Sequence, residues 1–322
     1  MKKIIREVDE KRGIVQITVA DERWYMKPVP NNETGIPEYV AVPSVTWIAG
    51  HWPKGIGFYK WLADKGWDEA EAVKQAAGDK GSRVHLAIER ILKGEEFRID
   101  TKVVDKGRSS EGNTIETELT YEELVCVQTF LDWFKAVQPE TIATERTIFS
   151  ESHGYAGTID YICRIGGVPY LIDFKTSKQV WREYELQVSA YRMAVDNGEN
   201  PILDQLGNPA NLSGLRTAIL QVGYTLNKDG YKFTEVGDAF PEFKIAQSIW
   251  KAENTSKRDG ELLTPGFTKR EFPIVLAPGK KEQASAATGV AETAVDISEH
   301  VTSEQAELEL NEGSKKRRTK AA

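Results

Sequence analysis

The sequence predicts an α/β fold built around one β-hairpin. Two β-rich runs, Gly157–Ile165 and Val168–Lys175, flank the pair Gly166-Gly167. Such a pair suits a two-residue loop, because both central residues of a type I′ turn need a positive φ. Segments with helical signals, among them Gly81–Lys93 and Arg182–Asp196, precede and follow the hairpin. Strands and helices therefore both occur along the chain.

The composition predicts a globular protein of the cytoplasm. The chain has 322 residues, of which 40% are hydrophobic and 28% charged. No run approaches the roughly eighteen apolar residues of a membrane span, and no apolar stretch near the start reads as a signal peptide. Cys126 and Cys163 are the only cysteines, which excludes a disulfide framework, a four-thiolate zinc site and a four-cysteine iron–sulfur cluster. The net charge of −7 argues against a simple basic nucleic-acid binder, but leaves open an enzyme with a local groove and a bound metal.

Before the hairpin, the sequence predicts strands and then helices. Lys3–Val8 and Gly13–Ala20 are β-like, and the pattern becomes helical around Pro43. One helix is expected to run from Glu69 to Ala77 and to end at Gly78, and a second to cover Gly81–Lys93. Residues 95–119 read as a polar excursion.

A capping box, Thr120 with Glu123, then predicts a helix through Val137, which Pro139 ends. The elements expected after it are a strand at Thr144–Phe149, the hairpin, the helix Arg182–Asp196, two strands within residues 215–236 and a helix at Glu242–Ala252. From about Ala277 the composition lacks periodicity, which predicts a disordered tail.

The hairpin places two aspartates and a lysine on one face. If Gly166 and Gly167 form the loop, positions whose numbers sum to 333 face each other, so Asp160 opposes Asp173. Lys175 shares the face of Asp173, because side chains alternate along a strand. Opposed like charges destabilise a sheet unless positive charge lies between them, and a divalent metal or an ammonium group meets that need. The sequence therefore predicts a metal site.

Two helices supply further polar residues at one-turn spacing. His85 and Glu89 are four residues apart before the hairpin, and Gln187 and Tyr191 are four apart after it. Two carboxylates, a histidine and a lysine suit phosphodiester hydrolysis, in which Mg²⁺ or Mn²⁺ polarises a phosphate oxygen and activates water.

These residues resemble the PD-(D/E)XK nuclease superfamily, specifically its RecB-like exonuclease branch. The resemblance is carried by Gly81-Ser82-Arg83-Val84-His85-Leu86-Ala87-Ile88-Glu89, Gly157-Thr158-Ile159-Asp160, Asp173-Phe174-Lys175-Thr176 and Gln187-Val188-Ser189-Ala190-Tyr191. Residues 43–77 are similar to the amino-terminal part of mitochondrial-genome-maintenance-type exonucleases and their phage relatives.

The resemblance implies a role for each site residue. Asp160, Asp173 and His85 would bind Mg²⁺ or Mn²⁺, with the Phe174 carbonyl as a further ligand and Lys175 as the catalytic lysine. The residues that would support the site or contact DNA are Glu89, Gln187 and Tyr191. Some relatives carry an iron–sulfur cluster, and this chain, with two cysteines, departs from them.

It also implies a restriction-endonuclease-like fold, with a mixed central sheet, flanking helices and a helical N-terminal lobe. The expected domains are a nuclease domain at 1–276 and the disordered tail at 277–322. Within the nuclease domain we expect a β/helical lobe at 1–80, the catalytic core at 81–200, and C-terminal strands and a helix at 201–276.

The expected function is a metal-dependent DNA exonuclease of phage or bacterial recombination, replication or repair. Its partners would be DNA, single-stranded or with free ends, and a single-strand annealing or binding protein, with no membrane. The alternatives are a structure-specific or single-strand endonuclease with the same core and a nucleic-acid-binding module that does not cleave.

Several of these residues also have a purely structural interpretation. Glu89 would pair with Lys93 on an exposed helix face, and Glu145 is either a strand-end charge or a support of the site. The aromatic residues between Trp47 and Trp67, interleaved with lysines, suit stacking of unpaired bases, or else form the core of a helical cap.

Overall fold

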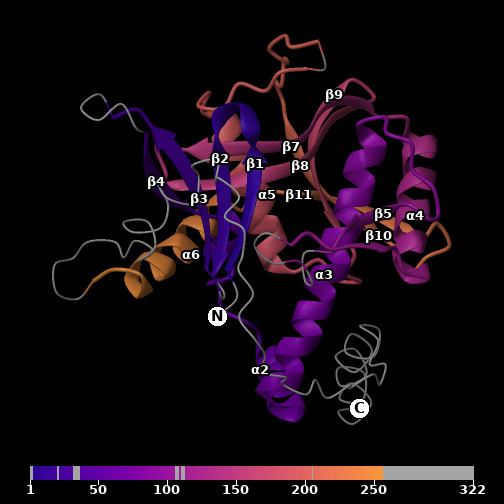
Figure 1. Ribbon diagram of the computed structural model, residues 1–322, viewed down its shortest axis with the longest axis horizontal. Coiled ribbons are helices and arrows are strands. Elements are labelled where there is room, and N and C mark those ends of the chain that lie inside the picture. The colour runs from indigo at the N-terminus through magenta and orange to yellow at the C-terminus, as the bar shows by residue number, and fades with distance from the viewer. Residues whose placement is uncertain are drawn as a thin grey trace, which may run out of the picture. The chain divides into compact units, whose positions relative to one another are not determined.

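A computed structural model of the chain describes residues 3–19, 22–31, 37–105, 109, 113–204 and 206–256 (Figure 1). The chain divides into two units, Met1–Pro28 with Val40–Leu263 and Val29–Tyr39 with Thr264–Ala322. Of the second unit only residues 29–31 and 37–39 are described, and there Asn31 Nδ2 donates a hydrogen bond to Glu38 Oε1 at 2.5 Å. The predicted disordered tail at 277–322 lies outside the described residues.

The predicted hairpin is present as β8 (Tyr155–Ile165) and β9 (Val168–Lys175). Its pairs run from Ile165↔Val168 to Tyr161↔Ile172, so the register in which positions sum to 333 is confirmed along this ladder. Gly166 and Gly167 have φ values of 57° and 81°, as a type I′ turn requires. In the described chain the hairpin belongs to a five-stranded sheet with the order β11-β10-β9-β8-β7. The other strands are β7 (Glu140–Ser150), β10 (Arg216–Val222) and β11 (Tyr231–Val236).

The sheet is mixed, and helices pack on both of its faces. Strand β10 runs parallel to β9, whereas the other neighbouring pairs are antiparallel. Helices α3 and α4 pack against one face, and α5, with α1 and α6 beside it, packs against the other. These helices are α1 (Val45–Ala49), α3 (Trp67–Leu92), α4 (Tyr121–Val137), α5 (Arg182–Asp196) and α6 (Phe240–Glu253). The α/β fold with a mixed central sheet and flanking helices is confirmed.

The main core lies between the sheet and the pair α3/α4. Alternate residues of the three central strands point into it, as the period of two requires. Phe130 and Trp133 of α4 meet Phe174 and Phe233 of the sheet in ring contacts with centroids 5.5 and 6.3 Å apart. The capping box predicted for α4 is present, with Glu123 Oε2 accepting from Thr120 N at 2.8 Å. No helix in the described ranges is long and apolar enough to cross a membrane.

The expected helical N-terminal lobe is wrong, because the first 43 residues are mostly strands. Strands β1 (Lys3–Asp9) and β2 (Ile14–Val19), joined by the 3₁₀ helix η1 (Glu10–Arg12), match the two predicted runs. They form a sheet with two strands that were not predicted, β3 (Glu22–Val29) and β4 (Glu38–Pro43). The three consecutive residues Trp24–Met26 are all buried, so β3 lacks the alternation that marks a half-buried strand.

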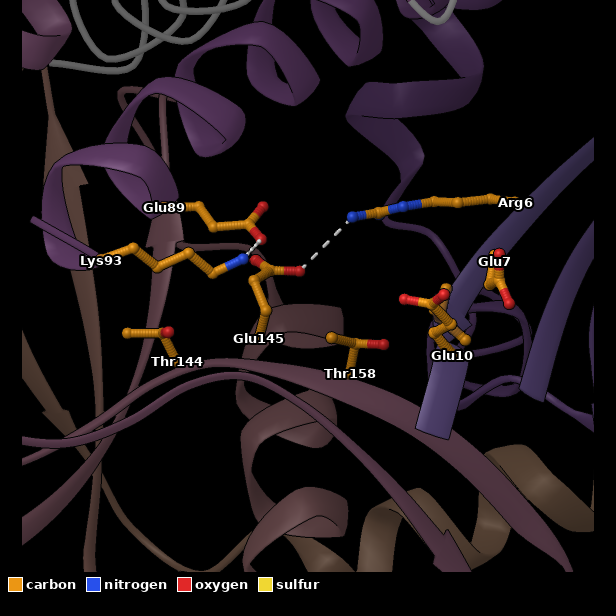
Figure 2. A pocket seen from close by; sticks show the side chains of 9 residues that line it. Arg6, Glu7, Glu10, Glu89, Lys93, Thr144, Glu145 and Thr158 are labelled. Carbon is orange, nitrogen blue, oxygen red and sulfur yellow. Dashed lines mark hydrogen bonds and ion pairs between the residues drawn. The ribbon is translucent and has the colours of Figure 1, made fainter. Parts of the chain in front are cut away.

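The N-terminal sheet contacts the central sheet at β7 and β8. Tyr25 packs its ring against Phe149, with centroids 6.1 Å apart, and its hydroxyl lies 3.0 Å from Thr158 Oγ1. From β1, Arg6 reaches Glu145 of β7, with 3.7 Å between Nη2 and Oε2 (Figure 2). The N-terminal strands therefore reach the part of the sheet that carries the candidate site.

The predicted helix break at Gly78 is also wrong. Helix α3 continues through Gly78 and Gly81 for 26 residues, and the separate helix before it is α2 (Ile56–Lys65). A glycine inside a helix costs only about 1 kcal/mol relative to alanine. Full burial of Val84, Ala87 and Ile88 offsets that cost. Within the polar excursion, β5 (Lys102–Val104) and β6 (Glu116–Glu118) form a small sheet that was not predicted.

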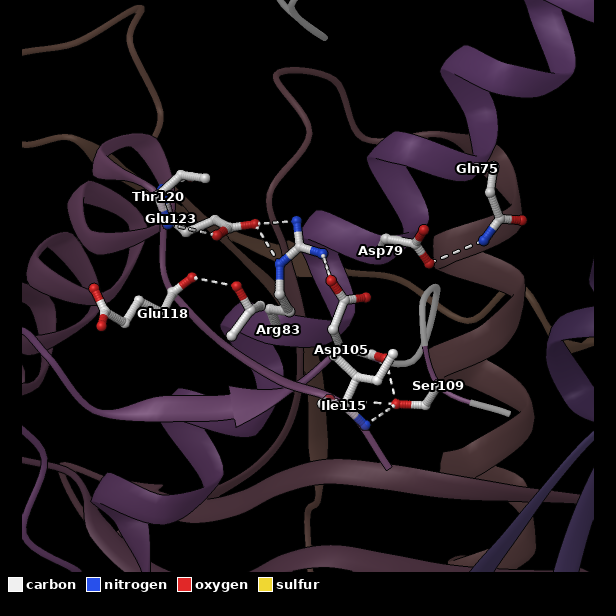
Figure 3. A network of polar contacts seen from close by, with 10 residues as sticks. Gln75, Asp79, Arg83, Asp105, Ser109, Ile115, Glu118, Thr120 and Glu123 are labelled. Carbon is white, nitrogen blue, oxygen red and sulfur yellow. Dashed lines mark hydrogen bonds and ion pairs between the residues drawn. The ribbon is translucent and has the colours of Figure 1, made fainter. Parts of the chain in front are cut away.

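A buried ion-pair network ties α3 to α4 and to the segment after β5 (Figure 3). Arg83 donates from Nε and Nη2 to Glu123 Oε1 at 2.9 and 2.6 Å, and from Nη1 to Asp105 Oδ2 at 3.3 Å. Glu123 is 1% exposed and Asp105 4% exposed. Because both carboxylates are out of water, Arg83 is the charge that makes their burial tolerable.

We expect Arg83→Met to lower the free energy of unfolding by about 3 kcal/mol, because it leaves two buried carboxylates without their cation. The matched control is Arg90→Met on the same helix, whose side chain is 37% exposed in its pair with Glu95. That change should cost less than about 1 kcal/mol. Urea unfolding of both variants measures the difference, and equal costs would show that the network does not stabilise the fold.

Candidate active site

The two aspartates of the hairpin lie where β8 and β9 stop pairing. Asp160 and Asp173 occupy the positions directly after the last pair, Tyr161↔Ile172. There a side chain replaces the backbone as the partner of β9, because Asp160 Oδ2 accepts a hydrogen bond from Phe174 N at 2.9 Å. Asp173 is 1% exposed, so this end of the hairpin carries acidic groups inside the protein.

A lysine and a histidine lie against these carboxylates. Lys175 Nζ lies 2.7 Å from Asp173 Oδ2, and His85 Nδ1 lies 3.4 Å from Asp160 Oδ2. The other ring nitrogen, His85 Nε2, donates to the Phe174 carbonyl at 2.8 Å. Helix α3 therefore brings His85 to the hairpin, and the structure assembles all four residues of the predicted metal site with Lys175.

The pKa values follow from burial and from these charges. Burial raises the pKa of Asp173 to about 6, with Lys175 opposing the shift and Asp160 adding to it. Burial would also raise the pKa of Asp160, but His85 and Lys175 outweigh it and the pKa is lowered. The pKa values of His85 and Lys175 are both raised, because the neighbouring carboxylates outweigh burial. The neighbouring carboxylates therefore favour the protonated forms of both His85 and Lys175.

Gln187 on α5 links the aspartate to the lysine. Its Nε2 donates to Asp173 Oδ1 and to the Tyr191 hydroxyl, both at 3.0 Å, and its Oε1 accepts from Lys175 Nζ at 3.4 Å. Gln187 and Tyr191 lie one turn apart on the face of α5 toward the sheet, as their spacing predicts. Gln187 therefore orients Asp173 and Lys175 together.

The lack of a side chain at Gly157 makes room for the ring of Tyr191. A Cβ atom at this position would lie 2.3 Å from Cε1 of the Tyr191 ring, which is closer than any real contact. The glycine of the Gly157-to-Asp160 segment is thus needed by the tyrosine of the Gln187-to-Tyr191 segment. Two motifs about 30 residues apart in the sequence are complementary in space.

A polar pocket of about 340 Å³ lies where α3, β7 and β8 meet the N-terminal sheet (Figure 2). It is lined by Arg6, Glu7, Val8, Glu10, Glu89, Lys93, Thr144, Glu145 and Thr158. Here Glu89 forms an ion pair with Lys93, with 2.6 Å between Oε1 and Nζ, as its structural interpretation expects. Glu89 therefore lines this cavity together with Glu145.

Glu145 lies opposite Asp160 across the β7–β8 ladder. The pairs on either side, Thr144↔Tyr161 and Arg146↔Ile159, leave these two residues facing each other without a ladder pair. Glu145 has a φ of 47°, unusual for a residue other than glycine. Burial raises its pKa to about 7, with Asp160 and Glu89 adding to the shift and Arg6 opposing it. Glu145 is therefore a neighbour of the site rather than a strand-end charge.

The aromatic residues between Trp47 and Trp67 differ in exposure. Trp47 packs against Trp24 and Trp250, with ring centroids 5.0 and 5.2 Å apart, and is half-buried. Tyr59 on α2 and Trp67 at the start of α3 are 52% and 69% exposed. These two exposed rings are therefore available for stacking.

Tyr184 contacts the site and was not predicted. Its ring covers Lys175 Nζ, 4.5 Å from the ring centroid. The signal was available, because Tyr184 precedes Gln187 by three residues and Tyr191 by seven and so shares their helix face.

The donor set fits a hard divalent cation. Two carboxylates, the Phe174 carbonyl and one imidazole are ligands that Mg²⁺ and Mn²⁺ accept. Asp173 Oδ2 is buried and has no hydrogen-bond partner within the described chain, although Lys175 faces it as an ion pair. In the described residues, however, no three His, Cys, Asp or Glu side chains are arranged to hold a metal ion. Instead, Lys175 lies against the carboxylate of Asp173, and His85 lies against that of Asp160.

A comparison of the sequence with known protein families identifies the family of this chain. A sequence model of the PD-(D/E)XK nuclease superfamily matches residues 58–296. Because the match covers more than half of the 322 residues, the chain belongs to this superfamily. Membership suggests nuclease activity, and hence a hydrolase with a nucleic-acid substrate; these nucleases typically use divalent metals. No curated protein matches the chain.

We expect Gly157→Ala to lower the free energy of unfolding by about 1–3 kcal/mol, because its Cβ overpacks against the Tyr191 ring. The control is Gly78→Ala, which meets nothing within 4 Å and should be neutral or stabilising in α3. Thermal unfolding compares the two. A Gly157→Ala melting temperature equal to that of wild type would contradict the close packing of Gly157 and Tyr191.

Proposed function

We propose that the protein is a Mg²⁺- or Mn²⁺-dependent DNA exonuclease of the RecB-like branch, acting in phage or bacterial recombination, replication or repair. The observation that carries the proposal is the meeting of Asp160, Asp173 and Lys175 at one end of the hairpin, with Gln187 bonded to Asp173. We also propose that residues 1–276 form the nuclease domain and 81–200 its catalytic core, since every proposed site residue falls in that core.

The assignment to the branch is supported by how its four sequence elements converge. His85 contacts Asp160, Gln187 contacts Asp173, and Tyr191 packs on Gly157. A degenerate relative that only binds DNA would be expected to have lost Asp160, Asp173 or Lys175, and this chain keeps all three. The intact set therefore favours cleavage.

Each residue has a distinct role in the proposed reaction. Asp160, Asp173 and the Phe174 carbonyl would hold Mg²⁺ or Mn²⁺, with His85 as a nitrogen ligand. When bound, such a cation polarises a phosphate oxygen and lowers the pKa of water. Lys175 orients the attacking water and offsets the negative charge that develops on the phosphate. Gln187 fixes the positions of the Lys175 and Asp173 side chains relative to each other, because it forms a hydrogen bond with each of them.

The proposed substrate is DNA with free or single-stranded ends. Tyr59 and Trp67 are exposed, and Lys60 lies beside Tyr59 on α2. Exposed rings near cations suit base stacking along a single strand. A single-strand annealing or binding protein is the proposed protein partner.

We expect linear DNA to be degraded from its ends in Mg²⁺ while covalently closed circles resist, because an exonuclease needs an end. Labelled linear and circular DNA, each single- and double-stranded, are digested with Mg²⁺ and with EDTA. EDTA should stop all cleavage. Asp173→Asn is the control for a contaminating nuclease and should be inactive, with a circular dichroism spectrum like that of wild type.

Rapid nicking of closed circles would instead support an endonuclease. No cleavage of any substrate in Mg²⁺ or Mn²⁺, with DNA binding intact, would identify a binding module.

We expect Lys175→Ala and His85→Ala to fail in different ways. Loss of the lysine removes a charge beside the reacting phosphate, so kcat should fall by about 10²–10³ at every metal concentration. Loss of the histidine should weaken metal binding, and high Mn²⁺ should restore part of the activity. Lys232→Ala on β11 is a matched control and should cleave as wild type does. Metal titrations of the cleavage rate measure all three, and rescue of Lys175→Ala alone would reverse the two roles.

A further inference from the structure

Among the residues that the structure describes, the Lys175 ammonium group has three partners, and one of them is an aromatic face. The Lys175 side chain is 17% exposed, and its Nζ lies 4.5 Å from the centroid of the Tyr184 ring. This is within the distance of about 6 Å at which a cation and a ring face attract. The other partners are Asp173 Oδ2 at 2.7 Å and Gln187 Oε1 at 3.4 Å.

These partners differ in what they would do when a divalent cation binds. Asp173 is a proposed ligand, so a cation and Lys175 compete for the same oxygen, Oδ2. Gln187 offers a single long hydrogen bond, and its amide nitrogen is already used by Asp173 and Tyr191. The Tyr184 ring is uncharged and would not compete for the cation. The Tyr184 ring is therefore the partner that can keep the Lys175 ammonium group in the site after a divalent cation has bound Asp173.

The position of Tyr184 is fixed by the first turn of α5. Its backbone N–H donates to the Trp181 carbonyl at 3.0 Å. On either side of it in the sequence, Glu183 pairs with Lys54 and Glu185 with Arg182. Two ion pairs therefore hold this turn.

The ring of Tyr184, rather than its hydroxyl, makes the contact. Within the described residues the hydroxyl forms no hydrogen bond, whereas the ring faces Lys175 Nζ. A phenylalanine in this place should therefore keep the interaction.

We propose that Tyr184 is a positioning residue, whose ring holds the Lys175 ammonium group beside the reacting phosphate when the metal occupies Asp173. This rests on the proposed function. It predicts that the ring is needed for turnover, that the hydroxyl is not, and that neither is needed for DNA binding.

The first test reads the contact without catalysis. In protein carrying ¹³C-labelled lysine, the Lys175 signal is assigned by its loss in Lys175→Ala. The Cε protons should be shifted upfield by the ring in wild type and Tyr184→Phe, and should return to ordinary values in Tyr184→Leu. The shift should persist when Mg²⁺ is added. A shift that is absent, or that vanishes with Mg²⁺, overturns the proposal.

The second test separates kcat from KM. Tyr184→Leu should lower kcat by about 3- to 30-fold with an unchanged KM for DNA and melting temperature, while Tyr184→Phe keeps the wild-type kcat. The matched control is Tyr224→Leu, which removes a ring 5.6 Å from Lys232 away from the site and should not change kcat.

The outcomes distinguish this proposal from the proposed function. Wild-type protein that cleaves no DNA overturns the nuclease proposal, whatever the lysine spectra show. Active wild type with a fully active Tyr184→Leu overturns the role of Tyr184 alone. A rise in KM or a fall in melting temperature that accounts for the lost rate also overturns it.

Discussion

The burial of opposed carboxylates on one hairpin is the constraint on which the rest of the site depends. Asp173 is 1% exposed, and Asp160 holds the matching position on β8, directly beyond the last pair of the ladder. A buried carboxylate without a partner costs several kcal/mol, so positive charge must be supplied from elsewhere in the fold. Lys175 comes from the same strand and His85 from α3. The hairpin can therefore fold in this form only if α3 lies against its end.

The same constraint fixes the helix on the other face. Asp173 Oδ1 needs a donor that water does not supply, and Gln187 on α5 provides it. Gln187 is placed by Tyr191, whose ring fits only because Gly157 has no side chain. A motif glycine, a helix and a buried acid thus depend on one another through packing and a single chain of hydrogen bonds. No single one of these sequence elements can therefore form the site alone.

The hairpin and its register could be predicted because they depend on local rules. The Gly-Gly turn fixes which residues face each other, and the period of two decides which share a face. Strand β3 could not be predicted in the same way, because Trp24, Tyr25 and Met26 are buried on both faces by other elements. The continuity of α3 through Gly78 likewise depends on tertiary packing farther along the helix. Local pattern reading fails where distant contacts decide the structure.

The site shows the same division between local and distant information. Asp160, Asp173 and Lys175 follow from the hairpin, but the positive φ of Glu145 opposite Asp160 has no signature in the sequence. The helix face of Tyr184 could have been predicted from its spacing. Its contact with the site, however, depends on the direction of the Lys175 side chain. That direction is set by charge, since the ammonium group turns to the buried Asp173.

In the proposed nuclease, the same side chains would serve two states of one site. In the structure described here, Lys175 and His85 lie against the carboxylates of Asp173 and Asp160, which makes the burial of the hairpin tolerable. A divalent ion held by Asp160 and Asp173 would supply positive charge in their place. His85 would then have a nitrogen for the ion, and the Lys175 ammonium group would face the phosphate. The groups that stabilise the fold in one state would thus act on the substrate in the other, because both arrangements balance the same carboxylate charge.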